Sequence, residues 1–352
     1  MKVLLLGGTG AMGGHLARIL STEGISTFVT TRSIRPNKPN ITYIQGNAHD
    51  FNFLENVLKK EHFDVCVDFM SYNTEEFNIN SRMILPKVGR YVYISSSRVY
   101  AESECAINET SPRLLDCCKD IDYLKTDEYA IAKAKQENFL FDGKSHNWTI
   151  VRPYITYSKD RLQFGEFEKE VWLKRCLNNK AIVVTNKILT RKTTLTYGKD
   201  VAIVLSAICQ NEKTIEEIYN PTVSDYLTWK DIFDVYASVI EKKIGIKIKL
   251  NYQEDSPLIY DNAAQYQVKY DRYFDRTFDN SKLSMLIDVN RMTSIKDGLS
   301  KCIDEFLSNP EFARFDAKKE AICDKITKDI QYSSQFPSFR QAIAYYVQRF
   351  IL

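Results

Sequence analysis

Residues 3–14 read VLLLGGTGAMGG, an apolar run that leads directly into a glycine-rich turn. The glycines at positions 7, 10 and 13 have the spacing of a phosphate-binding loop between a strand and a helix. Such glycines allow a tight turn, close approach of a pyrophosphate to the main chain, and close packing of the helix on the strand. The helix that follows offers unpaired N–H groups to the phosphates. We therefore predict that Gly7, Gly10, Ala11, Met12 and Gly13 bind a dinucleotide cofactor.

The first 155 residues alternate short apolar runs with stretches whose apolar residues recur at helical spacing. Runs that are apolar on both faces are typical of parallel strands covered by helices. This alternation predicts an α/β fold with a doubly wound parallel sheet. Beyond about residue 158 the pattern loosens and the charge rises, which predicts a second, smaller domain. The strand candidates are residues 3–7, 26–32, 41–46, 63–70, 90–96 and 147–153.

The composition is that of a globular protein, with 44% hydrophobic and 26% charged residues among 352. A formal net charge of +3 is too even to indicate a nucleic-acid partner. No apolar run reaches the length of a membrane span, so we expect no membrane partner. Eight scattered cysteines without an export signal favour reduced thiols and a cytoplasmic location. The four histidines lack metal-ligand spacing, so we expect no metal.

The end of the second strand candidate bears on the choice of cofactor. It reads Thr30-Thr31-Arg32-Ser33 and lacks the Asp or Glu that usually binds the ribose 2′-hydroxyl of NAD. A guanidinium suits a 2′-phosphate, so Arg32 favours NADP over NAD. Arg32 stacked on adenine or lying in solvent would leave either cofactor open.

Tyr129 and Lys133 place a phenol and an ammonium one helical turn apart on the same face. A nearby cation lowers the pKa of a phenol, so such a pair can exchange a proton with a carbonyl or alcohol oxygen. The spacing alone is weak, because Tyr226 and Lys230 share it. The first pair follows RYVYISSSRVY (residues 90–100), whose hydroxyls lie at the carboxyl end of a predicted strand, where ligands bind.

Taken together, GGTGAMG, ISSSRVY, the Tyr129–Lys133 pair and WTIVRPYITYS resemble the extended short-chain dehydrogenase/reductase superfamily. The resemblance is to the NAD-dependent epimerase/dehydratase branch, which acts on nucleotide sugars, and covers about residues 1–310. It implies an NAD(P)-binding Rossmann domain at 1–157 and a substrate domain at 158–310. Segments at about 180–222 would return to the sheet, with strands near 183 and 219 contributing to the sheet or its border. Residues 311–352 would form a helical extension.

The resemblance also implies roles for single residues. Tyr129 resembles the catalytic acid/base, and Lys133 resembles the lysine that binds the nicotinamide ribose. Ser96 resembles the serine that steadies the reacting oxygen, with Ser97 as the alternative. Pro153 would line the nicotinamide, and Tyr154 beside it would also contact the substrate.

Several positions depart from the pattern of this branch. Ser97-Arg98 stands where 4,6-dehydratases carry Asp-Glu, which disfavours dehydration. Asn47 replaces an acidic residue, so the adenine contact would be by amide. DFMSYN (residues 68–73) replaces a turn of small residues and places Tyr72 among the substrate candidates.

Two arginines are candidates for binding the phosphates of a nucleotide sugar. The usual phosphate-binding arginine falls on Thr193, and Arg191 or Lys192 is a possible substitute. Arg276 in YDRYFDRTFDNSK is the second candidate, because a bidentate guanidinium can hold a diphosphate. For each arginine, a surface or packing role is the competing interpretation.

The leading functional hypothesis is a reductase of 4-keto nucleotide sugars, and an epimerase that retains NAD is the alternative. DFMSYN and FDRTFDNSK also resemble an atypical subgroup that includes chloroplast stem-loop RNA-binding proteins. An RNA-binding or regulatory module is therefore a third hypothesis, disfavoured by the intact Ser96, Tyr129 and Lys133. Family members often dimerise through two helices, here about 74–86 and 125–142, with Ile79, Ile84 and Leu85 as candidate interface residues. A homodimer is expected on this ground.

Overall fold

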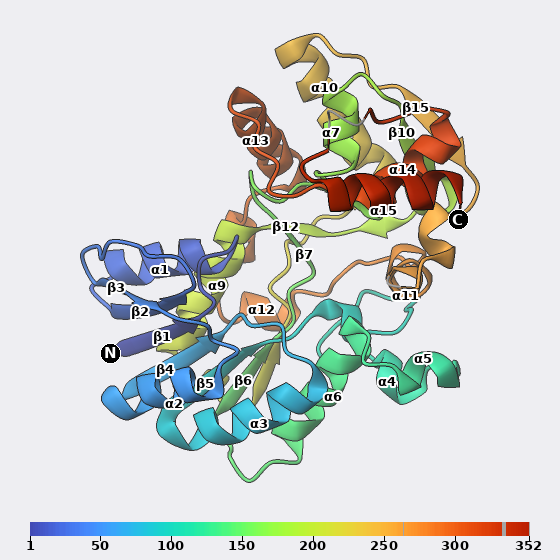
Figure 1. The fold of residues 1–352 in the computed structure, drawn as a ribbon. Coiled ribbons are helices and arrows are strands. Elements are labelled where there is room, and N and C mark those ends of the chain that lie inside the picture. Colours follow the sequence, from blue (N-terminus) through green and yellow to red (C-terminus); the bar gives the residue numbers. More distant parts are fainter. Residues whose placement is uncertain (263, 333–335, 352) are drawn as a thin grey trace. The chain divides into compact units, whose positions relative to one another are not determined.

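Within the described residues, 1–262, 264–332 and 336–351 of the computed structural model, seven parallel strands form the central sheet (Figure 1). The strand order is β13-β6-β5-β4-β1-β2-β3, so the order reverses between β1 and β4. Ligands bind in the crevice at such a reversal. The bounds are β1 (Lys2–Leu6), β2 (Ser26–Thr31), β3 (Ile41–Gln45), β4 (Phe63–Asp68), β5 (Val88–Ile94), β6 (Trp148–Val151) and β13 (Glu217–Tyr219).

Helices cover both faces of this sheet (Figure 1). Val3 and Leu5 belong to one apolar core with α1 (Gly13–Thr22) and α9 (Gly198–Gln210). Leu4 and Leu6 belong to the opposite core. That second core is covered by α2 (Phe51–Lys60), α3 (Thr74–Ile84) and α6 (Tyr129–Phe141). The unbroken apolar run of β1 is therefore explained, because alternate side chains enter two cores. The predicted doubly wound α/β sheet is confirmed.

The chain divides into two compact units. The first contains Met1–Thr156, Thr194–Ser224 and Thr277–Thr293, and the second contains Tyr157–Thr193, Asp225–Arg276 and Ser294–Leu352. β13 joins the sheet near residue 219, as expected. The strand near residue 183 does not, because β10 (Ile182–Thr185) pairs with β15 (Leu250–Gln253) in the second unit. The functional division into cofactor, substrate and extension segments stays a prediction.

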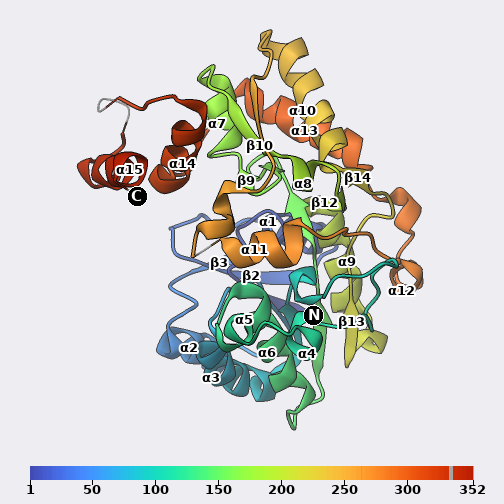
Figure 2. The same ribbon diagram turned by 90° about the vertical axis from the view of Figure 1, so that its right-hand side faces the viewer.

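The second unit is built mainly from helices (Figure 2). Buried Arg175 and partly exposed Lys180 form ion pairs with Glu320 and Asp324, and these pairs attach α14 to the rest of the unit. None of the described helices has the length and apolar character needed to cross a membrane. The helices are α7 (Trp172–Leu177), α8 (Asn186–Leu189), α10 (Trp229–Ile244), α11 (Gln265–Gln267), α13 (Ile295–Ser308), α14 (Ala317–Thr327) and α15 (Phe339–Phe350).

The remaining elements are short. In the first unit they include α4 (Leu114–Cys117), α5 (Ile121–Lys125), α12 (Ser281–Ser284) and β12 (Leu195–Tyr197). β7 (Ile155–Tyr157) lies where the two units join along the chain. The second unit also contains β8 (Gln163–Phe164), β9 (Phe167–Glu168), β11 (Lys192–Thr193) and β14 (Leu227–Thr228).

The apolar residues expected at a dimer interface have different positions. Ile84 and Leu85 are buried in the core beneath the sheet, so they are accounted for within one chain. Ile79 on α3 is 51% exposed. The homodimer stays a prediction, and it now depends on Ile79 rather than on all three residues.

The glycine loop is packed too tightly for other side chains at one position but not at another. A Cβ atom placed on Gly13 would lie 2.6 Å from the Cα of Gly8, which is main chain and cannot turn aside. A Cβ placed on Gly10 would meet nothing within 4 Å. Gly13 therefore holds α1 against the strand end, whereas Gly10 faces open space.

We expect Gly13→Ala to lower the free energy of unfolding by about 1–3 kcal/mol, the usual cost of forcing atoms into a packed interior. Gly10→Ala should leave stability within about 0.5 kcal/mol of wild type, because surface changes of this kind cost little. Urea denaturation of the two variants checks the difference. Equal stabilities would show that the close approach of α1 to Gly8 is not a constraint.

Candidate active site

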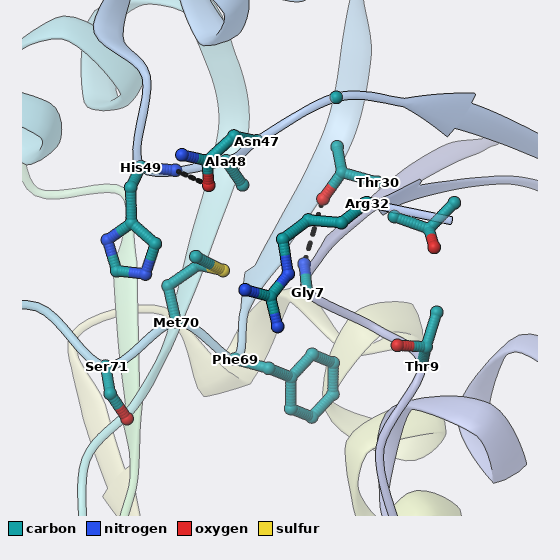
Figure 3. A pocket seen from close by; sticks show the side chains of 12 residues that line it. Gly7, Thr9, Thr30, Arg32, Asn47, Ala48, His49, Phe69, Met70 and Ser71 are labelled. Atoms are coloured by element: carbon teal, nitrogen blue, oxygen red, sulfur yellow. Dashed lines mark hydrogen bonds between the residues drawn. The ribbon is translucent and has the colours of Figure 1, made fainter. Parts of the chain in front are cut away.

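A cavity of about 250 Å³ lies at the carboxyl ends of β1, β2, β3 and β4 (Figure 3). Gly7, Arg32 and Asn47, all predicted to bind the cofactor, line it together. These residues are far apart in sequence and meet because neighbouring parallel strands end at the same edge of the sheet. The complete lining is Gly7, Thr9, Thr30, Thr31, Arg32, Gly46, Asn47, Ala48, His49, Phe69, Met70 and Ser71.

The walls of this pocket differ in charge. Arg32 extends into it, and none of the described lining residues carries a carboxylate (Figure 3). On another wall, Nδ1 of His49 lies 2.6 Å from a carboxylate oxygen of Glu76. The side-chain oxygen of Asn47 accepts the main-chain N–H of His49 at 3.2 Å, which orients the amide. The pocket is thus electropositive at Arg32, which suits a phosphate group.

The phosphate-binding end of α1 has the features that a pyrophosphate requires. In the described part of the chain no side chain caps the helix at Met12, and its first turn contains no acidic residue. The N–H groups of Gly14 and His15 donate to the main-chain oxygens of Gly10 and Met12 at 3.0 and 3.1 Å, and the positive dipole end of the helix remains open to an anion. Gly7 has a φ of +66°, and a Cβ there would lie 2.7 Å from the sulfur of Met70. These residues fit the dinucleotide that the sequence predicts.

Met70 is a pocket residue that the sequence argument missed. It follows β4, and together with Phe69 and Ser71 it forms the wall opposite Arg32 (Figure 3). Its main-chain oxygen lies 3.5 Å from Nζ of Lys133. The position of this turn beside the strand-order reversal was the available signal, because ligand-binding loops gather there.

The two candidate serines have different surroundings at the end of β5. Ser97 is fully buried, and its hydroxyl donates to the main-chain oxygen of Arg152 at 2.6 Å. The hydroxyl oxygen of Ser96 accepts the N–H of Arg98 at 3.2 Å and keeps its own proton available. The main-chain N–H of Ser97 also donates to the oxygen of Pro153 at 3.0 Å, which places Pro153 next to the serines. The geometry favours Ser96 over Ser97 as the residue that steadies an oxygen.

Tyr129 and Lys133 lie where the helical spacing places them. Tyr129 is the first residue of α6 and is 40% exposed, so its hydroxyl can reach a ligand. Nζ of Lys133 lies 5.9 Å from the centre of the Tyr129 ring and donates to the main-chain oxygen of Ile94 at 2.9 Å. Burial lowers the pKa of Lys133 to about 8, against the opposing attraction of Asp68.

Arg98 is a second residue that sequence reasoning did not place in the site. Its guanidinium carbon lies 5.3 Å above the Tyr129 ring, and one of its nitrogens is 2.6 Å from Glu128. The other carboxylate oxygen of Glu128 accepts the N–H of Ala130, so the ion pair also caps α6. A cation therefore lies beside the candidate acid/base. In the branch that the sequence resembles, 4,6-dehydratases carry an acidic residue at this position.

Asp68 is buried behind Lys133, in a layer with Tyr91 and the main chain of Met70. Its carboxylate accepts the Tyr91 hydroxyl at 2.7 Å and the Met70 N–H at 2.9 Å. Burial raises the pKa of Asp68, and the hydrogen bond from Tyr91 opposes part of that rise. Tyr72, predicted to contact substrate, is buried in the core under this layer. The structure thus gives Tyr72 a packing position rather than an exposed one.

The remaining substrate candidates lie in both units. Tyr154, in the first unit, is buried with its ring 5.6 Å from Phe278. Arg276, in the second unit, is fully buried and donates to Asp271 and to the main-chain oxygen of Tyr270, each at 3.1 Å. Asp271 also pairs with Arg272, so this carboxylate is shared between two guanidinium groups, and the diphosphate role of Arg276 stays a prediction. Nε of Arg191 is buried and has no partner in the described part of the chain.

No group of three or more potential metal ligands occurs within residues 1–262, 264–332 and 336–351. The eight cysteines are all free, and five of them are buried.

We expect Lys133 to make stability depend on pH in a specific window. Its pKa is lowered to about 8 in the folded chain, so between pH 8 and its normal value the unfolded chain binds more protons. The free energy of unfolding should therefore rise by about 1–3 kcal/mol from this group as the pH increases from 7 to 9.5. Urea unfolding of wild type and Lys133→Met at both pH values isolates the contribution.

The matched control is Lys135→Met, which removes a partly exposed lysine from the same helix. Between pH 7 and pH 9.5 the free energy of unfolding of wild type should rise relative to that of Lys133→Met. In Lys135→Met it should rise as much as in wild type. Parallel pH curves for all three proteins would contradict a buried ammonium at Lys133.

Comparisons with known proteins agree with this architecture. The model of the NAD dependent epimerase/dehydratase family matches residues 3–220. The "Chloroplast stem-loop binding protein of 41 kDa b" of Arabidopsis thaliana is 29% identical over 259 residues. That match covers 69% of this chain but only 63% of the relative.

Solved structures share the fold at low identity. WbmH of Bordetella bronchiseptica, solved with NAD+, has a TM-score of 0.67 at 15% identity, covering 88% of this chain and 99% of that one. UDP-glucuronic acid 4-epimerase of Bacillus cereus, solved with UDP-glucuronic acid and NAD, has 0.67 at 18%, covering 88% and 100%. The dTDP-glucose 4,6-dehydratase of Bacillus anthracis str. Ames, solved with NAD, has 0.67 at 16%, covering 89% and 98%.

Proposed function

We propose that this chain, which belongs to the NAD dependent epimerase/dehydratase family, is an NAD(P)-dependent oxidoreductase of nucleotide-linked sugars. The proposed reaction is reduction of a 4-keto group. The observation that carries the proposal is the position of Lys133, which binds the end of β5 next to Ser96, lies 5.9 Å from the Tyr129 ring, and contacts Met70, the residue packed on Gly7. Family membership confirms the sequence resemblance but does not choose among its reactions.

The roles of the three residues follow from their chemistry. A bound nicotinamide would supply the hydride. Tyr129 would give its proton to the sugar oxygen as that oxygen gains negative charge. Ser96 would donate a hydrogen bond to the same oxygen. Lys133 would turn its ammonium from Ile94 toward the nicotinamide ribose and hold positive charge near the phenol.

Reduction is favoured over the alternatives by two cations. Arg32 in a pocket wall without carboxylates suits NADP, which reductases consume once per turnover. Arg98 lies beside Tyr129, and Ser97-Arg98 occupies the two positions where a dehydratase would need an acidic pair. Epimerisation with retained NAD is the alternative. Because the fold is similar to that of a UDP-glucuronic acid 4-epimerase, the activity assay below includes this reaction.

We expect Tyr129→Phe to lower turnover by ~10²–10⁴, the usual loss when a general acid is removed. Folding and cofactor affinity should change little, because only one exposed hydroxyl is lost. Ser96→Ala should cost less, since the proton donor remains, and Lys133→Met should damage both turnover and cofactor binding. The measurement is loss of NADPH absorbance with a panel of 4-keto nucleotide sugars.

The same assay separates the candidate reactions. Consumption of NADPH in proportion to product indicates a reductase, whereas isomer formation with catalytic cofactor indicates an epimerase. Full activity in Tyr129→Phe on the substrate identified by the panel would refute the catalytic assignment.

We further expect NADP(H) to bind more tightly than NAD(H), because the Arg32 guanidinium can pair with a 2′-phosphate. Arg32→Asp should reverse or flatten this preference by repelling that phosphate. Calorimetric titration of both proteins with both cofactors is the test. Arg35→Asp is a matched control, because Arg35 is exposed and does not line the pocket. Wild type that binds NAD tenfold more tightly would contradict the assignment.

RNA binding is the second candidate function, and the name of the Arabidopsis thaliana relative is what favours it. An RNA-binding surface should give affinity that falls steeply with salt. Fluorescence anisotropy with a labelled stem-loop RNA at two salt concentrations tests this property. Tyr129→Phe should leave any such binding unchanged, so the two functions can be separated in one set of proteins.

The cytoplasmic location and the homodimer are also part of the proposal. The plant relative is named as chloroplastic, and that name describes the relative alone. Sedimentation at micromolar concentration tests the dimer, and Ile79→Arg should dissociate it.

A further inference from the structure

The helix α15 presents an apolar face to solvent. Phe339, Ile343 and Phe350 are 82%, 49% and 60% exposed. Residues separated by four and eleven positions return to the same side of a helix, so these three side chains form one stripe along α15. Ile351, directly after the helix, is also exposed.

The opposite face of α15 is already packed. Tyr345 is fully buried, and its hydroxyl donates to Asp324 of α14 at 2.6 Å. Tyr345 also belongs to a small apolar cluster with Phe315 and Ala321. Both views of the ribbon place the pair α14–α15 at an edge of the second unit (Figures 1 and 2). The stripe is therefore not an inner surface of this helix pair.

The charge around the stripe is positive. Between Phe339 and Phe350 the helix contains Arg340 and Arg349 and no acidic residue. The guanidinium carbon of Arg349 lies 5.0 Å from the centre of the Phe350 ring. On α14, Lys318 and Lys325 are exposed, whereas Glu320 and Asp324 turn inward to Arg175 and Lys180. Glu320 and Asp324 are thus neutralised inside, and Arg340, Lys318 and Lys325 reach solvent, whereas Arg349 is partly buried and donates to the main-chain oxygen of Asp329 at 3.4 Å.

A second copy of this chain is a poor occupant for the stripe. In an antiparallel pair of α15 helices, Arg340 of one copy would approach Arg349 of the other, and like charges would repel. The exposed apolar side chains also offer on the order of 500 Å² of surface, below the ~800 Å² per partner that stable interfaces bury.

We propose that the outer face of α15 docks on an anionic lipid surface. An amphipathic helix with aromatic and aliphatic side chains on one face and arginines at its borders can lie in the plane of a bilayer interface. Basic side chains near the surface add attraction to anionic headgroups. The proposal concerns peripheral contact. It departs from the expectation of no membrane partner, which rested only on the lack of a spanning segment.

The test uses the full-length protein and sedimentation with two kinds of vesicle. One contains phosphatidylcholine with about one-fifth phosphatidylglycerol, and the other contains phosphatidylcholine alone. Wild type should partition at least ~10-fold more strongly onto the anionic vesicles, and ~0.5 M salt should weaken that binding. Phe339→Ser combined with Phe350→Ser should reduce vesicle binding ~10-fold or more, with the thermal midpoint unchanged.

The matched control is Tyr260→Ser combined with Met285→Ser, which removes two strongly exposed apolar side chains outside α15. This control should bind vesicles like wild type. Phe350→Trp provides a second readout that does not need a loss of binding. All three natural tryptophans are buried, so a blue shift of fluorescence on adding anionic vesicles would report residue 350.

Three results would overturn the proposal. The first is absence of binding to anionic vesicles together with no blue shift in Phe350→Trp. The second is vesicle binding that the control variant loses as much as the α15 variant. The third is a dimer in sedimentation that Phe339→Ser dissociates, because the stripe would then be covered by a second copy. Failure of the proposed sugar reduction would leave all of these outcomes unaffected.

Discussion

The carboxylate of Glu137 is fully buried beneath the candidate site, where the Arg152 guanidinium donates to both of its oxygens at 2.8 Å. Ser95 donates to it at 2.6 Å and Arg113 at 3.1 Å. These partners come from the end of β5, the end of β6 and the loop before α4. A buried charge is stable only when it is paired and hydrogen-bonded, so the two arginines offset the charge of Glu137 and Ser95 adds a neutral hydrogen bond.

This constraint sets the geometry of the proposed chemistry. Glu137 lies on α6, the helix that begins with Tyr129 and carries Lys133 one turn later. Ser95, which Glu137 binds, precedes Ser96. The buried Glu137 thus links the helix that carries Tyr129 to the strand end that carries Ser96. The same network continues from Arg152 to Tyr100 and on to Asn220, so the segment that returns to the sheet at β13 is held by it as well.

Those parts of the fold and site that depend on local spacing could be predicted from the sequence. The glycine loop, the strand–helix alternation and the Tyr129–Lys133 pair are of this kind. Partners far apart in sequence could not be predicted. The apolar run at 182–185 has the pattern of a sheet strand, but the pattern does not specify that residues 250–253 pair with it. Arg276 lies at a motif position, and the motif does not specify that its guanidinium donates to Asp271.

Residues placed in the candidate site by contacts with other elements are the least predictable, because the sequence does not specify those neighbours. Arg98 is positioned by its contacts with Glu128 and the Tyr129 ring. Met70 is positioned by its contacts with Gly7 and Lys133. The groups that would move a hydride and a proton match the family, while these two differ from its usual pattern. Similarity at 15–18% identity therefore identifies the fold but does not specify the substrate. A cation at Arg98 changes the charge that a reacting group meets, so specificity in this chain should depend on Arg98 more than on the shared residues.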